Sequence, residues 1–207
     1  MQNFLAVDTS GNHLTVVAVK DGKAFSAFIE NCAMKQSVLL MNAVDEALQK
    51  AKLTLAECDF FASVVGAGSF TGIRIGISAV KGFCSALKKP SLPITSFDVM
   101  AYNALDSKIL CLVDALHDCY YACGYEKGEV VYPPAYLTEE EVLALVKEGY
   151  KLVSCQSVPI AEKAKLLIVD PVSGLGKAAV ALAEKNAFAP LTALYVRKSS
   201  AEINLGK

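Results

Sequence analysis

The stretch that decides the fold reads Gly66-Ala-Gly-Ser-Phe-Thr-Gly-Ile-Arg-Ile-Gly76. It follows an apolar run, residues 60–65, and it opens an amphipathic segment that we expect to be helical over 73–87, ending before Pro90. Glycines between a strand and a helix allow positive φ angles and let another group approach the backbone without meeting a Cβ atom. The spacing fits no phosphate-binding pattern. Thr71 stands where a dinucleotide loop has its third glycine, and no Gly-Lys-Ser/Thr follows to make a Walker loop.

The composition of the 207 residues indicates a globular protein with a substantial core. Hydrophobic residues make up 54% of the chain, and a net charge of −1 gives no cationic field of the kind that attracts a phosphate backbone. We therefore expect no autonomous binding of tRNA or DNA. The apolar runs are too short to cross a bilayer, and Met1 is not followed by the basic start of a signal peptide, which predicts a cytoplasmic protein. Seven scattered cysteines without a Cys-x-x-Cys pair predict reduced core residues.

Turn signals and alternating polarity divide the chain into two similar halves. At an offset of 106 residues, Asp8 falls on Asp114 and the turn glycine Gly22 falls on Gly128. Few aligned positions are identical, so the evidence for a repeat is the shared order of strand, aspartate, strand, glycine turn and strand. The expected strands are 4–7, 14–19, 24–30, 60–65, a strand from 109, and 151–155, and the expected helices are 36–52, 73–87, 138–148 and 175–185.

The glycine-rich stretch resembles the Gly-Pro-Gly-Ser-Phe-Thr-Gly-Leu-Arg-Ile-Gly motif of the TsaB (YeaZ) family, with Ala67 in place of proline and Ile73 in place of leucine. Residues 5–10 resemble that family's first strand, and residues 195–199 are similar to its C-terminal segment. The resemblance implies an α/β fold: the duplicated β-β-β-α-β-α arrangement of the actin, heat-shock chaperone and sugar-kinase (ASKHA) superfamily. It predicts two subdomains, residues 1–104 and a smaller one at residues 105–207, and the repeat supports this plan.

The resemblance also implies a function. It is that of a non-catalytic scaffold or activator subunit in the synthesis of N6-threonylcarbamoyladenosine in bacterial tRNA. Such a subunit binds its paralogue, the TsaD transferase, together with the TsaE ATPase, and it forms homodimers when alone. The resemblance implies that the chain pairs with TsaD through its first two helices. It also implies that tRNA meets this chain only through the complex.

The first two predicted helices carry small and apolar residues on more than one side. Gly72, Gly76 and Ala79 leave one side of the second helix nearly bare, so a neighbour from this chain or from another can approach closely. The apolar arc of the first helix exceeds the roughly 100° that one core face needs, which favours another chain. Arg74 lies in a first helical turn, where the dipole disfavours a cation, and indicates either an external anionic or carbonyl partner or a solvated side chain. The predicted interface comprises Leu40, Met41, Val44, Leu48, Gly72, Arg74, Gly76 and Ala79.

Asp8, Thr9 and Ser10 stand where the first hairpin of the superfamily touches phosphate, so they form a candidate, vestigial nucleotide site. The alternative is that Asp8 and Asp114 end strands and bond to turn amides. A kinase or ATPase of the same fold, using these two aspartates, is the rival function. Because no adenosine loop is recognisable in the second half, we expect no cofactor.

Other catalytic groups are sparse. His13 and His117 are the only histidines, and both fall in turns, where we expect them to be solvated. They do not make the His-x-x-x-His pair by which TsaD holds a metal, so we expect no metal site, and a metalloprotease lacks its ligands. Ser69 lacks the second flanking glycine of a nucleophile elbow, so we expect no catalytic residue. Gln36 replaces the family's usual histidine at the start of the first helix.

Overall fold

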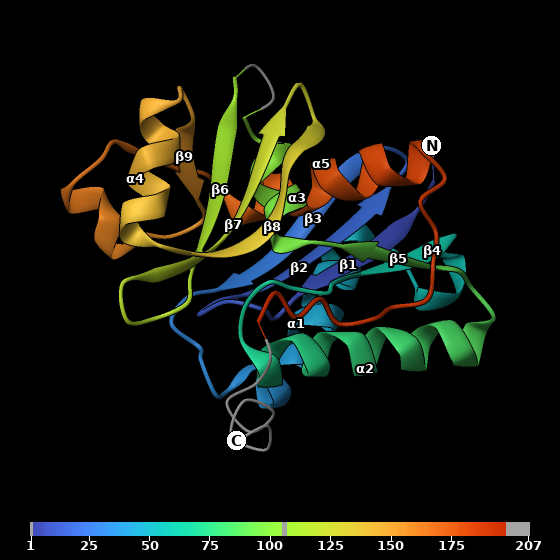
Figure 1. Cartoon of the computed structure of the whole chain (residues 1–207). Helices are drawn as coiled ribbons and strands as arrows, with labels where there is room; N and C mark the ends of the chain where they lie inside the picture. Colours follow the sequence, from blue (N-terminus) through green and yellow to red (C-terminus); the bar gives the residue numbers. More distant parts are fainter. Residues whose placement is uncertain (1, 105–106, 198–207) are drawn as a thin grey trace.

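The computed structural model describes residues 2–104 and 107–197 and contains two five-stranded mixed sheets (Figure 1). The first sheet has the order β3-β2-β1-β4-β5, and the second, read in the matching direction, has the order β8-β7-β6-β9-β10. The strands are β1 (Phe4–Asp8), β2 (Leu14–Lys20), β3 (Lys23–Ile29), β4 (Phe60–Val64), β5 (Ser91–Ile94), β6 (Ile109–Asp114), β7 (Cys119–Glu126), β8 (Glu129–Thr138), β9 (Lys151–Ser154) and β10 (Leu166–Ile168). The helices are α1 (Gln36–Ala51), α2 (Phe70–Leu87), α3 (Ser96–Ala101), α4 (Glu139–Lys147) and α5 (Pro171–Glu184), with short 3-10 turns η1 (Leu55–Glu57) and η2 (Pro159–Glu162).

The internal repeat is confirmed strand by strand. β1 and β6 each pair with one antiparallel neighbour and one parallel neighbour. The turn between β2 and β3 has positive φ angles of 50° at Asp21 and 78° at Gly22, and the turn between β7 and β8 has 52° at Lys127 and 80° at Gly128. The same hairpin is therefore built twice, because both turns need a residue that tolerates the left-handed region at their second position.

Helices cover both faces of the first sheet. Alternate residues of β1 point to opposite sides, so Leu5 packs with α1 and α2 while Phe4 packs with α5. Figure 1 shows α1 and α2 on one side of this sheet and α5 on the other. The second sheet packs α4 on one face, and its other face, around Cys111 and Tyr125, meets α3.

Two helices begin earlier than the sequence pattern predicts. α2 begins at Phe70 rather than at Ile73, because the Ser69 side chain caps it by accepting a hydrogen bond from the Gly72 amide at 3.2 Å. α5 begins at Pro171, because the Asp170 side chain accepts from two amides of the first turn.

The chain after α5 returns to the first sheet. We call residues 188–197 the return segment. Its Ala189 amide donates to Ser91 O at 3.1 Å, and its Leu194 amide donates to Val65 O at 2.7 Å. α5 and the return segment thus belong to the second half of the sequence and pack on the first sheet, while the boundary between residues 104 and 105 stays a prediction. The last two residues of the family-like segment 195–199 lie outside the described residues.

Within the described part of the chain, no helix is both long enough and apolar enough to span a membrane.

Candidate functional site

The glycine junction packs against the chain itself. A Cβ atom on Gly66 would lie 2.5 Å from Leu194 O in the return segment, and one on Gly68 would lie 2.4 Å from Ser10 O. A Cβ on Gly72 would lie 2.0 Å from Thr9 O. The bare side of α2 is therefore required by the close approach of β1 and the loop that follows it. Of the two neighbours that the sequence left open, the structure shows the internal one.

Most members of the predicted partner interface are buried within this chain, and their role in binding a partner stays a prediction. Gly72 and Gly76 are buried against β1 and β4, and a Cβ on Gly76 would meet Thr9 Oγ1 at 2.7 Å. Leucine at Gly76 would therefore collide with this core. Three further predicted members are buried core residues of α1: Leu40, Val44 and Leu48. Met41, Arg74 and Ala79 remain accessible.

Exposed apolar side chains gather instead at the start of α1. Met34 is 96% exposed, Val38 77% and Met41 47%, and Val38 and Met41, three residues apart in α1, lie on one side of the helix. We call these three residues the α1 patch. The apolar second side of this helix was predicted from the sequence, but Met34 was not, because it lies before the helix and has a φ angle of 67°.

One loop holds the starts of α1 and α2 together. The Gln36 amide nitrogen Nε2 donates to Gly11 O at 3.1 Å, the Cys32 amide donates to Asn12 O, and the Ser69 amide donates to Ser10 O at 2.8 Å. Gln36, which stands where the family has histidine, is thus buried as an anchor of α1. The α1 patch and the first turn of α2 consequently lie at the same end of the first sheet.

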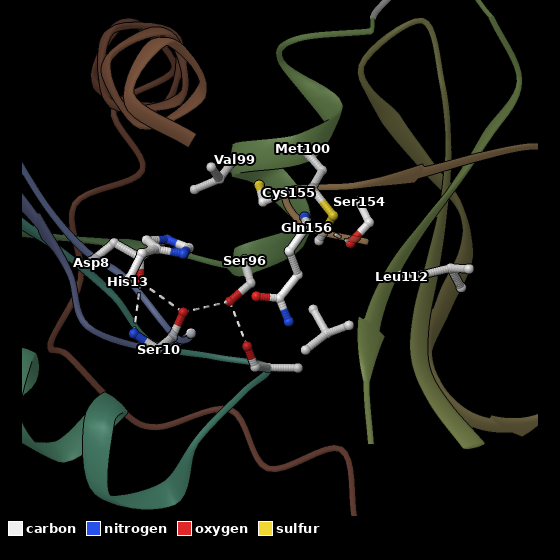
Figure 2. Close-up of a pocket in the computed structure, with 13 residues that line it drawn as sticks. Asp8, Ser10, His13, Ser96, Val99, Met100, Leu112, Ser154, Cys155 and Gln156 are labelled. Atoms are coloured by element: carbon white, nitrogen blue, oxygen red, sulfur yellow. Dashed lines mark hydrogen bonds and ion pairs between the residues drawn. The ribbon is translucent and has the colours of Figure 1, made fainter. Parts of the chain in front are cut away.

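Hydrogen bonds connect several of the residues that line the cleft between the two sheets (Figure 2). Asp8 Oδ1 accepts from the Ser10 amide at 2.8 Å and from Ser10 Oγ at 2.7 Å. Ser96 Oγ donates to Ala67 O at 2.5 Å and lies 3.2 Å from Ser10 Oγ. Thr9 Oγ1 donates to Gly72 O at 2.6 Å. The candidate nucleotide residues therefore bond to their own chain. Nucleotide binding there stays a prediction.

Both strand-ending aspartates close a turn. Asp114 Oδ1 accepts from the Leu116 amide at 2.8 Å, as Asp8 accepts from the amide two residues on. The interpretation that these aspartates bond to turn amides is confirmed.

His13 is not the solvated residue that the sequence predicts. Its side chain is 13% exposed, and Nε2 lies 3.4 Å from Asp8 Oδ2. Burial acts to lower the pKa of His13, but the hydrogen bond and the charge of Asp8 outweigh it and raise that pKa above 6.5. Burial likewise acts to raise the pKa of Asp8, and the bonds from His13 and Ser10 lower it below 3.8. His117 is exposed in its turn, as predicted.

This pair predicts a pH dependence of stability. A raised folded pKa means that protonated His13 stabilises the fold fully below pH 6.5 and that this contribution is lost as the pH rises through the folded value. The contribution of ionised Asp8 to stability is fully present above pH 3.8 and is lost as the pH falls through the lowered pKa of Asp8 in the folded chain. We expect His13→Gln to destabilise the chain more at about pH 6 than at about pH 8.5. Urea unfolding at both pH values measures this, and an equal loss at both would contradict it.

The cleft is small, and its side chains offer little for catalysis. Its cavity has a volume of about 40 Å³, whereas ligand sites usually occupy about 300–1,000 Å³. Burial raises the pKa of the Cys155 thiol, which lines it, to about 12, so the thiolate nucleophile is scarce at neutral pH. Among residues 2–104 and 107–197, no three His, Cys, Asp or Glu side chains are grouped so as to hold a metal ion. The arrangement favours a structural cleft over a kinase site.

Comparisons with known sequences find relatives in the TsaD and TsaB families. The family model of TsaD, described as tRNA N6-adenosine threonylcarbamoyltransferase, matches residues 30–197. The tRNA threonylcarbamoyladenosine biosynthesis protein TsaB of Buchnera aphidicola is 33% identical over 101 residues, which is 49% of this chain and 48% of that protein. TsaB of Escherichia coli K12 is 27% identical over 130 residues, 61% of this chain and 56% of that protein. The chain thus spans about half the length of these curated relatives.

Comparisons with solved structures concern the fold. YeaZ from Pseudomonas aeruginosa superposes with a TM-score of 0.74 at 21% identity, over 94% of this chain and all of that one. Component A of (R)-2-hydroxyglutaryl-CoA dehydratase from Acidaminococcus fermentans has a TM-score of 0.53 at 10% identity, over 90% of this chain and 99% of that one. These similarities and the duplicated sheets confirm the expected ASKHA-like fold.

Proposed function

We propose, because this chain belongs to the TsaD family and to its TsaB (YeaZ) branch, that it is a non-catalytic subunit for N6-threonylcarbamoyladenosine synthesis on bacterial tRNA. In this role it binds a TsaD transferase in the cytoplasm, and the TsaE ATPase joins the assembly. The chain supplies a surface that holds the transferase in its active arrangement. It does not bind tRNA alone, since its net charge of −1 provides no attraction for phosphates.

The observation that carries this proposal is the α1 patch. Val38, exposed by 77%, and Met34, exposed by 96%, contribute nothing to the core, and apolar side chains at such exposure favour a protein partner. The neighbouring cleft supports a role without chemistry, because Asp8 and Ser10 already bond to each other. We expect the patch to be covered by the transferase, and by a second copy of this chain when the transferase is absent.

The test is a double substitution in the patch. Met34→Asp with Val38→Asp places two carboxylates where apolar contact is expected, so the dissociation constant for the TsaD protein of the source organism should rise about 100-fold or more. Analytical size exclusion and biolayer interferometry measure it. Val180→Asp is the matched control, because Val180 is also an exposed apolar residue, at 43%, but lies on α5 at the opposite face of the first sheet. Unchanged association in the double variant would count against the proposal.

A further inference from the structure

We propose that Phe70 and Tyr195 hold Arg74 in position to bind a carboxylate of the partner protein, so that the return segment completes the surface formed by α1 and α2. This inference rests on the proposed function, because it names the chemical group that the transferase presents beside the α1 patch.

The two rings and the guanidinium form one cluster. Phe70 and Tyr195 stack with ring centroids 4.6 Å apart and planes 16° apart. The Arg74 Cζ atom lies 5.8 Å from the Phe70 centroid and 5.7 Å from the Tyr195 centroid. Arg74 Nε donates to the Tyr195 hydroxyl at 2.9 Å, which fixes the plane of the guanidinium.

This geometry leaves the binding end of Arg74 available. Nε is used by Tyr195, whereas the two terminal nitrogens donate to no acceptor among residues 2–104 and 107–197. No carboxylate in that part of the chain lies within 4.0 Å of Arg74, since all five ion pairs there involve lysine or His13. A flexible arginine loses side-chain freedom when it binds, and a pinned one has lost it beforehand. The cluster is therefore pre-organised for a bidentate acceptor.

The surroundings favour a protein carboxylate over a nucleic-acid phosphate, although the guanidinium fork fits both. The loop at residues 10–12 bonds to the starts of both α1 and α2, so Arg74 and the apolar side chains of the α1 patch lie at the same end of the first sheet. An apolar surface with one pre-organised arginine is typical of a protein interface hot spot. A nucleic-acid surface would instead carry several basic residues, and the net charge of the chain is −1.

A double-mutant cycle tests the proposal with the TsaD protein of the source organism. Arg74→Ala should raise the dissociation constant about 10- to 100-fold, and Tyr195→Phe, which keeps the ring but removes the hydroxyl, about 3- to 10-fold. In the Arg74→Ala background, Tyr195→Phe should change the constant less than about twofold, because the tyrosine acts through the arginine. Equal effects of Tyr195→Phe in both backgrounds would overturn the inference.

The chain offers a matched control. Lys108 Nζ lies 4.1 Å from the centroid of the Tyr150 ring, and Tyr150 packs in the core of the second sheet. Tyr150→Phe should therefore leave the affinity unchanged. If the unaltered chain does not bind TsaD at all, the proposed function fails. If it binds and Arg74→Ala binds equally well, only the carboxylate inference fails.

Zero-length cross-linking identifies the acceptor. Arg74→Lys keeps the charge and introduces an amine, which a carbodiimide condenses with a carboxylate to form an amide while the reagent takes up the water. Mass spectrometry of the complex should find position 74 joined to an Asp or Glu of the transferase. A link to a carboxylate of this chain, or binding of the variant without any link at position 74, would overturn the proposal. Reduced tRNA binding in Arg74→Ala with unchanged TsaD affinity would also overturn it.

Discussion

Gly72→Ala is expected to lower the free energy of unfolding by about 3 kcal/mol, because the added methyl group meets a backbone atom that has nowhere to move. The new Cβ atom would lie 2.0 Å from Thr9 O, and Thr9 is fixed by its hydrogen bond to Gly72 O and by the end of β1. Relief requires α2 to separate from the first sheet, which would open the core around Ile73. Chemical denaturation followed by circular dichroism measures the loss.

Gly82 provides the control within the same helix. It is exposed, and a Cβ atom there would have no heavy atom within 4 Å. Gly82→Ala should therefore stabilise the chain by about 0.5–1 kcal/mol, the ordinary helix preference for alanine over glycine. Equal effects of the two substitutions would show that close packing of β1 does not explain the glycine at position 72.

Asp8→Ala is expected to cost about 3–5 kcal/mol of stability, because it leaves buried donors without an acceptor. The lost carboxylate accepts from the Ser10 amide, from Ser10 Oγ and from His13, and its own side chain is only 4% exposed. Thermal and urea unfolding near pH 6, where His13 is protonated, should show the full effect. This separates a structural aspartate from a catalytic one, for which activity would fall while stability held.

The equivalent aspartate of the second half is the control. Asp114 ends β6 in the same way, but its side chain accepts one hydrogen bond, from the Leu116 amide, and is partly exposed. Asp114→Ala should therefore cost only about 1 kcal/mol. A loss at Asp114 as large as that at Asp8 would contradict the assignment of the extra stability to the His13 and Ser10 contacts.

Much of the fold could be predicted from local sequence patterns, because certain backbone conformations restrict the residue type at particular positions. The Asp8/Asp114 and Gly22/Gly128 correspondence predicted the repeat, because a strand end and a hairpin turn each restrict the residue at one position. β5 was missed since Pro93 argues against a strand, yet β5 lies at the edge of the first sheet, where proline is tolerated. α3 was missed although Thr95 and Asp98 form a capping box, since the helix has only six residues.

The surface could not be predicted in the same way. Residue type says that Gly76 is small but not what approaches it, and the approach of Thr9 and Ser63 depends on how β1 and β4 pack under α2. The pairing of Arg74 with Tyr195 joins residues 121 positions apart and depends on the path of the return segment. Long-range contacts of this kind decide which side of a helix is free, so residue types alone could not show that Gly72 and Gly76 are buried in this chain.

The crossing of α5 to the first sheet has a consequence for biosynthesis. Phe4 and Phe60 stack at 4.8 Å on the face that α5 covers, with Leu175, Ala178 and Ala179 among their fully buried neighbours. On the ribosome, these aromatic rings emerge more than a hundred residues before the helix that shields them. Nascent chains are therefore expected to expose this apolar surface for most of translation. Chaperones should release the nascent chain only when α5 has left the exit tunnel.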